Sequence, residues 1–117
     1  MENKRKLGQA KEEAAAQFLL QEGFTLLERN YYFPGGEIDL VARDQEYLVF
    51  IEVKYRKNTG FGFPEEAVTV SKQRKLALGA RRYLYEHRIS PETPCRFDVI
   101  SICGNELVRI ENAFCLT

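Results

Sequence analysis

Three charged side chains occur within two neighbouring apolar segments, and their types could together support metal chemistry at a phosphate. Asp39 lies in the segment 36–43 (GEIDLVAR), and Glu52 and Lys54 lie in the segment 47–56 (YLVFIEVKYR). Both segments are predicted to be strands, since they are rich in branched and aromatic residues. Carboxylate oxygens are ligands that Mg²⁺ prefers. A lysine beside them could orient an attacking water or stabilise charge that develops on a phosphate.

The two segments are predicted to pair as an antiparallel hairpin with a two-residue turn at 45–46. In this register Asp39 faces Glu52, and Glu37 faces Lys54, with opposite Cβ atoms roughly 4.5–5.5 Å apart. Two carboxylates that face each other repel, and a bound cation would offset that repulsion. The alternative is a structural cluster of ion pairs among the same four side chains, and spacing alone leaves both interpretations open.

The other face of the hairpin is predicted to be wholly apolar and to pack against a helix. It consists of Ile38, Leu40, Ala42, Val49, Ile51 and Val53. A slip of one residue would move Asp39 or Glu52 into the core, so burial should determine the register.

Two amphipathic segments are predicted to be helices that position further side chains near this hairpin. The first spans 5–22, and Glu12 borders its buried stripe, from which it could reach the sheet or remain a surface glutamate. The second spans 71–88, with Ser71 as a candidate N-cap. Gln73 in its first turn could hydrogen-bond a phosphate or a water at the metal.

The second helix carries a basic face. Six basic residues against one acidic residue give this segment a charge of +5; they are Lys72, Arg74, Lys75, Arg81, Arg82 and Arg88 against Glu86. Phosphate is the natural partner of such a face, and a solvated surface is the alternative. His87 is predicted to be a packed residue on the apolar stripe of the same helix.

The remaining segments complete an α/β architecture. Strands are predicted at 24–33, 96–102 and 106–111, and a long loop at 57–70. The order is then helix, three strands, helix and two strands, and the long connection through the second helix allows a parallel pair in a mixed sheet. Asp98 is expected to form structural ion pairs with Arg96 and Arg109.

Composition indicates an ordinary soluble protein with one domain over residues 1–117. The chain is 44% apolar and 29% charged with a net charge of zero, so any nucleic-acid partner must be recognised locally. No apolar run approaches the ~18–20 residues of a membrane span. The charged N-terminus has no apolar signal core and the three cysteines lack metal spacing, so we expect reduced thiols, a cytoplasmic location and no membrane partner.

Several kinds of site are excluded by missing motifs. The sequence has no glycine-rich phosphate loop, no GxSxG motif, no cysteine with a histidine partner at motif spacing and no Cys/His zinc pattern. Metal chemistry with oxygen ligands is what remains.

The chain resembles the PD-(D/E)xK nuclease superfamily, because Asp39 is followed after twelve residues by Glu-Val-Lys at 52–54 and preceded by a helix with an acidic residue. Ile38 stands where the superfamily name has a proline. The likeness is closer to the YraN-like proteins, a bacterial group related to archaeal Holliday-junction resolvases, and covers nearly the whole chain. It is carried by GGEIDLVAR, VFIEVKYR, FGFPEEAVTVSKQRKL and CRFDVI. Lys11 stands where that group usually has glycine.

The resemblance implies a restriction-endonuclease-like core of order αβββαββ, with a mixed central sheet flanked by helices and Mg²⁺ or Mn²⁺ at the strand end. Asp39 and Glu52 would be metal ligands, with Glu12 directly or through water, and Lys54 would be the catalytic lysine. Gln73 matches the glutamine of the helix after the sheet and would act with them. The nucleic-acid backbone would lie on Arg56, Lys72, Arg74, Lys75, Arg81 and Arg82.

The activity that this resemblance implies is metal-dependent endonucleolytic hydrolysis of phosphodiester bonds, with branched or structured DNA as the substrate. An enzyme that resolves junctions needs two active sites, so a homodimer is expected. The alternative is a binding protein on the same scaffold that keeps the acids for stability and binds DNA or another protein without cutting.

Overall fold

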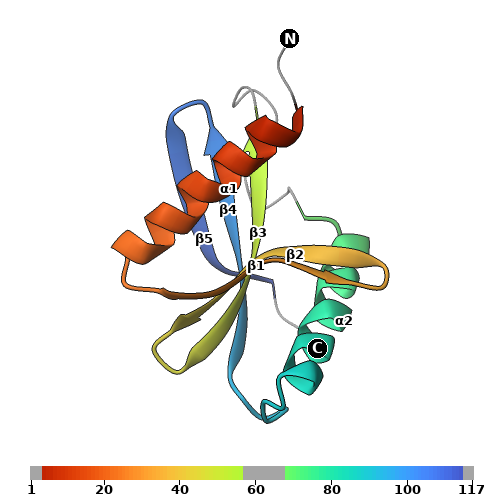
Figure 1. Ribbon diagram of the computed structural model, residues 1–117. Coiled ribbons are helices and arrows are strands. Elements are labelled where there is room, and N and C mark those ends of the chain that lie inside the picture. The colour runs from red at the N-terminus through yellow and green to blue at the C-terminus, as the bar shows by residue number, and fades with distance from the viewer. Residues whose placement is uncertain (1–3, 57–67, 115–117) are drawn as a thin grey trace.

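The structure is a computed structural model that describes residues 4–56 and 68–114, with side chains for 8–55 and 68–114. Its element order is the predicted one, αβββαββ (Figure 1). The elements are α1 (Lys4–Gln21), β1 (Thr25–Phe33), β2 (Gly36–Asp44), β3 (Tyr47–Arg56), α2 (Val70–Glu86), β4 (Cys95–Cys103) and β5 (Glu106–Phe114). Most of the predicted loop, at 57–67, and Cys115 lie outside the described residues.

The strands of the described residues form one mixed sheet in the order β1-β2-β3-β4-β5. Neighbouring strands are antiparallel except β3 and β4, which are parallel and are connected through α2. The predicted parallel pair is therefore confirmed. The β2–β3 hairpin also has the predicted register, with Val41 opposite Phe50 and Asp44 opposite Tyr47.

The two helices pack on opposite faces of the sheet. Along β3, Val49 and Ile51 belong to the apolar cluster that contains the buried side of α1, whereas Leu48 and Phe50 belong to the cluster on α2. Successive side chains of a strand point to opposite faces, so β3 is covered on both sides. The helix residues of these clusters are Ala15, Ala16 and Leu19 of α1 and Leu76, Ala80 and Tyr83 of α2.

β2 changes the faces of its side chains between residues 38 and 40, contrary to the predicted alternation. Leu40 and Ala42 pack in the α1 cluster as expected, but Ile38 packs in the α2 cluster. The reason is the path of the β1–β2 hairpin, which leaves β3 and reaches across to α2 (Figure 1). There Phe33 packs so closely on Gly79 that a Cβ on this glycine would overlap the phenylalanine ring.

The ends of α2 differ from the predicted caps. The N-cap is Thr69, not Ser71, because the Thr69 hydroxyl accepts a hydrogen bond from the backbone N–H of Lys72 at 3.1 Å. At the other end His87 is exposed but stacks on Tyr83 with ring centroids 3.9 Å apart, so the predicted packing occurs at the surface.

No helix in the described part of the chain is long and apolar enough to cross a bilayer.

Asp98 on β4 shows how this chain stabilises a buried acid for structure. Its carboxylate accepts hydrogen bonds from Arg96 at 2.9 and 3.0 Å, from Arg109 at 3.0 Å and from the backbone N–H of Asn112 at 2.9 Å. The predicted structural ion pairs are thus confirmed, and both carboxylate oxygens have partners.

Candidate active site where β2 leaves β3

The backbone ladder between β2 and β3 ends just before the predicted pair of carboxylates. Its last pair is Leu40 with Ile51. At the next position the Asp39 carboxylate accepts the backbone N–H of Val53 at 2.8 Å. A side-chain oxygen therefore supplies a partner for a backbone donor where the strands diverge, and this places Asp39 beside β3.

The divergence also changes the pairing of Glu37. Glu37 lies opposite Tyr32 in β1, and the β2–β3 ladder does not extend to a Glu37–Lys54 pair. Instead, the amine of Lys54 lies 3.8 Å from Oε1 of Glu52 on its own strand. The predicted cluster is therefore rearranged, with Glu52 at its centre.

Asp39 and Glu52 are buried acids that destabilise each other's charged form. They are 7% and 6% exposed. Burial is the main cause that raises the pKa of Asp39 to about 7, and the Glu52 carboxylate raises this pKa further, while the hydrogen bond from Val53 lowers it. Burial also raises the pKa of Glu52, against the opposing effect of Lys72 and Lys54. Ionising both acids is therefore costly unless positive charge lies between them.

Two lysines from different elements form ion pairs with the same oxygen of Glu52. Besides Lys54, the amine of Lys72 in the first turn of α2 lies 3.5 Å from Oε1. The other oxygen, Oε2, is buried and has no hydrogen-bond partner among the described residues. Both amine distances exceed the usual 2.7–3.2 Å of an N–H···O hydrogen bond, so these contacts are ion pairs that leave half of the carboxylate unsatisfied.

Glu12 on α1 is half-buried and borders the site, as its place on the helix predicts. Burial raises its pKa, as do the nearby charges of Glu37 and Glu52. Within residues 4–56 and 68–114, however, no group of three or more His, Cys, Asp or Glu side chains is close enough to hold a metal ion. That Glu12 joins Asp39 and Glu52 as a ligand, directly or through water, stays a prediction.

The first turn of α2 contributes Lys72 more directly than Gln73. The side-chain amide of Gln73 donates to the backbone carbonyl of Val68 at 3.1 Å, which anchors the start of the helix. Lys72 was predicted from the sequence only to bind phosphate, and its contact with Glu52 was not predicted. A signal was present, because Lys72 lies four residues before Leu76 and eleven before Tyr83, which puts it in line with these two residues of the buried stripe.

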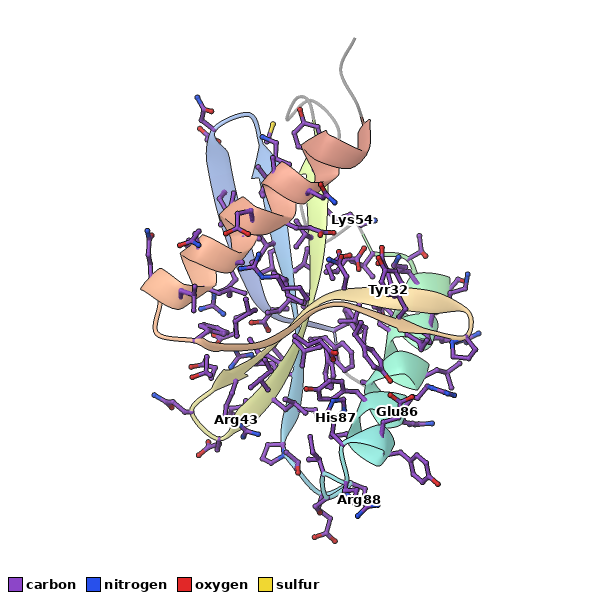
Figure 2. All side chains as sticks on the ribbon, viewed as in Figure 1. Tyr32, Arg43, Lys54, Glu86, His87 and Arg88 are labelled. Atoms are coloured by element: carbon purple, nitrogen blue, oxygen red, sulfur yellow. The ribbon has the colours of Figure 1, made fainter. Side chains whose placement is uncertain are left out.

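The predicted basic face is largely exposed along α2. Arg74, Lys75, Arg81 and Arg82 are all exposed, and Arg82 pairs with Glu86 at 2.7 Å. The backbone of Arg56 ends β3, but its side chain lies outside the described side chains. Lys72 in the first turn of α2 lies near Glu52, and Figure 2 shows Arg88, just beyond the other end of α2, far below Lys54, so the basic face leads away from the carboxylates.

The carboxylate pair could bind a divalent cation on chemical grounds. Its donors are carboxylate oxygens, which Mg²⁺ and Mn²⁺ prefer. Oε2 of Glu52 is a buried acceptor that lacks a partner among the described residues, and a cation would supply one. The residues therefore fit such an ion, and the two lysines, whose side chains are 33% and 37% exposed, could contact an anionic substrate.

Comparisons with known proteins agree with one another. The model of the uncharacterised protein family UPF0102 matches residues 11–102. A UPF0102 protein of Lachnoclostridium phytofermentans is 50% identical over 112 residues, which are 96% of this chain and 95% of that protein. A UPF0102 protein of Saccharophagus degradans is 45% identical over 87% of this chain and 86% of its own length. Another, from Desulforapulum autotrophicum, is 47% identical over 97% of this chain and 98% of its own length.

Proposed function

The chain belongs to the UPF0102 family, and we propose that it is a cytoplasmic, metal-dependent endonuclease of the PD-(D/E)xK superfamily that hydrolyses phosphodiester bonds in branched or structured DNA. The fold supports this proposal, because the mixed sheet and the order αβββαββ are consistent with a restriction-endonuclease-like core. Fold alone does not determine chemistry, so the proposal depends on the site.

The observation that carries the proposal is the contrast between two buried acids of the same sheet. Both oxygens of Asp98 are satisfied by arginines and a backbone N–H. Glu52 has a buried oxygen with no partner among the described residues and lies beside Asp39, whose charge it disfavours. A carboxylate buried for stability normally has its hydrogen bonds. Glu28 also has a buried oxygen without a partner among the described residues, but Glu52 in addition has a second buried acid, Asp39, beside it, and a cation that binds there explains this combination better.

The chain's own residues would divide the chemistry as follows. Asp39 and Glu52, with Glu12 directly or through water, would hold Mg²⁺ or Mn²⁺, which when bound supplies Lewis-acid stabilisation of charge on the phosphate. Lys54 orients the attacking water and offers its charge to the phosphate oxygens. Lys72 lies on the same side as Lys54 and holds a phosphate oxygen from α2.

Substrate binding would follow the basic face of α2, with Arg74, Lys75, Arg81 and Arg82 contacting phosphates. Arg56 would extend this face at the end of β3. Cutting both strands of a junction requires two active sites, so the proposal includes a homodimer. These contacts carry no sequence information, which agrees with recognition of DNA by its shape.

A cleavage assay tests the proposal. Purified protein with Mg²⁺ or Mn²⁺ is incubated with duplex, single-stranded, flapped and four-way DNA. We expect cleavage of a branched substrate, with a rate that Asp39→Asn and Lys54→Met each lower by at least about a hundredfold. Metal-dependent cleavage that survives both substitutions would come from another site or a contaminant, and binding without any cleavage would favour the non-cleaving alternative.

Two neighbouring glutamates of α1 provide a matched pair of variants for the role of Glu12. Glu13 is exposed and forms an ion pair with Arg29, whereas Glu12 is half-buried beside the carboxylates. Glu12→Gln should lower the cleavage rate, and Glu13→Gln should not. Equal effects of the two substitutions would remove Glu12 from the site.

A further inference from the structure

A hollow of about 380 Å³ lies at the C-terminal end of α2, away from the carboxylates. Its lining combines apolar side chains with cations and one aromatic ring, namely Arg81, Leu84, Tyr85, Arg88, Ile89 and Pro91. Leu84 and Ile89 also pack against the α2 cluster of the core. The floor is therefore held in place by the fold, and the rim is polar and accessible.

The cations of the rim are available to a ligand. Among the described residues neither Arg81 nor Arg88 forms an ion pair, whereas the adjacent Arg82 is held by Glu86 at 2.7 Å. Tyr85, between the two arginines in sequence, is 85% exposed. The hollow is thus bordered by one exposed aromatic ring and two arginines that form no ion pair among the described residues, and all three are accessible to a ligand.

The combination of groups selects the kind of ligand. Aromatic rings bind nucleobases by stacking, at roughly 1–3 kcal/mol per base, and guanidinium groups bind phosphates through several donors. A free phosphate would not use the apolar floor of Leu84, Ile89 and Pro91, and a purely apolar ligand would not use two arginines. An unpaired nucleotide uses both.

We propose that this hollow binds one unpaired nucleotide of a DNA substrate, with its base against Tyr85 and its neighbouring phosphates on Arg81 and Arg88. Binding of a nucleotide in the hollow does not depend on the proposed nuclease function; only the distance from the hollow to the cleaved bond rests on it. Arg74 lies seven residues before Arg81 and is also exposed, so it occupies the same side of α2. It would contact the strand between the hollow and the carboxylates.

The helix sets the distance between the two sites. Lys72, which contacts Glu52, precedes Tyr85 by thirteen residues, or roughly 20 Å along the helix axis at 1.5 Å per residue. The two side chains leave α2 on different sides, Lys72 towards Glu52 and Tyr85 into solvent, so the distance between the sites is at least this long. The axial distance corresponds to roughly six steps of a DNA strand at ~3.4 Å each, which is therefore a minimum. The site therefore favours DNA in which an unpaired segment begins at least about six nucleotides from the cleaved bond, as in a flap or fork.

Binding assays in EDTA test the hollow separately from catalysis. The probes are fluorescently labelled flapped DNA and a blunt duplex of the same sequence. Tyr85→Ala should weaken binding of the flapped probe about tenfold, within the range for one stacked base, and should leave the blunt duplex nearly unchanged. Tyr85→Phe keeps the ring and should bind like the wild type.

The arginines are tested by the dependence of affinity on salt. Arg81→Gln together with Arg88→Gln should reduce the slope of log K against log salt by about 1.4, because each phosphate contact on a single strand contributes roughly 0.7. Arg43→Gln is the control, since Arg43 is exposed on β2 and lies outside the hollow. This control should keep the preference for the flapped probe.

A fluorescent base reports the position directly. With 2-aminopurine placed along the flap, we expect quenching by wild-type protein at a position at least about six nucleotides from the cleaved bond, a minimum set by the helix rise, and none by Tyr85→Ala. If Tyr85→Ala binds flapped DNA as tightly as the wild type, the inference is overturned, even in a protein that cleaves DNA. If this variant instead separates a dimer with unchanged DNA affinity, the hollow is a protein interface and the inference is equally overturned. Binding that depends on Tyr85 in a protein without cleavage supports the hollow and counts against the nuclease.

Discussion

Asp39→Asn should stabilise the metal-free protein at pH 8, although it removes a buried hydrogen-bonded group. Asparagine has the shape of aspartate, and its carbonyl oxygen can still accept the N–H of Val53, which the carboxylate accepts at 2.8 Å. The substitution therefore removes mainly the negative charge. That charge is disfavoured by burial and by the Glu52 carboxylate.

The size of the effect follows from the pKa. The pKa of the Asp39 carboxyl is 3.8 in the unfolded chain and about 7 in the folded protein. At 1.36 kcal/mol per pH unit, this difference lowers the free energy of unfolding by roughly 4 kcal/mol as the pH rises from 3.8 to 7. The pKa of this acid is raised in the folded state. Between pH 4 and pH 7 the folded state therefore binds more protons than the unfolded state, so the stability of the protein falls as the pH rises. The variant still bears the cost of ionising the buried Glu52 carboxyl. We therefore expect Asp39→Asn to raise the free energy of unfolding by about 2–4 kcal/mol at pH 8 and by very little at pH 4.

Urea unfolding in EDTA at pH 4, 6 and 8 measures this difference. Asp98→Asn is the matched control, since Asp98 is also buried but pairs with Arg96 and Arg109. Breaking such a buried pair costs about 3–5 kcal/mol, so this variant should be less stable than the wild type at pH 8. A loss of stability in Asp39→Asn at pH 8 would show that Asp39 is a structural acid, and the argument for a cation would then fail.

Three further predictions concern the site and its support. Mn²⁺ should bind about tenfold more tightly at pH 8 than at pH 6 in titration calorimetry, because the Asp39 carboxyl, with a pKa of about 7, must lose its proton first; equal affinities would contradict this. Lys54→Met should lower the cleavage rate by about 10²–10³ while calorimetry still detects the metal, and loss of metal binding as well would make Lys54 structural. Gly79→Ala should destabilise the protein by about 1–3 kcal/mol in thermal denaturation, because its Cβ would overlap the Phe33 ring. Adding Phe33→Ala should then cost less in the Gly79→Ala background than in the wild type, and fully additive effects would contradict the contact.

Local patterns were sufficient for the elements and for the β2–β3 register. Leu40 and Ile51 are fully buried and paired as predicted, because a slip by one residue would exchange apolar and charged faces. The helices were predicted to within a few residues at their ends. The N-cap was wrong because Thr69 and Ser71 are both chemically suited to the role, and the choice depends on how the chain enters the helix.

Long-range geometry was less predictable. The simple alternation placed Ile38 with Leu40, but the hairpin bends towards α2 and Ile38 packs there. The same bend ends the ladder before Asp39 and removes the expected Glu37–Lys54 pairing. Alternation describes a regular strand, and it cannot show where tertiary packing makes that strand leave its neighbour.

By itself, the amino-acid sequence determined which side chains can serve the site: Asp39, Glu52 and Lys54 share the end of one hairpin because residue types and a two-residue period put them there. Only the tertiary structure decided that Lys72 from α2 would reach Glu52 and that Gln73 would bind Val68. It also decided that one oxygen of Glu52 would be left without a partner among the described residues. The physical reason is that a strand pattern records neighbours along the chain, whereas the charge and hydration of a buried carboxylate depend on every element that packs around it.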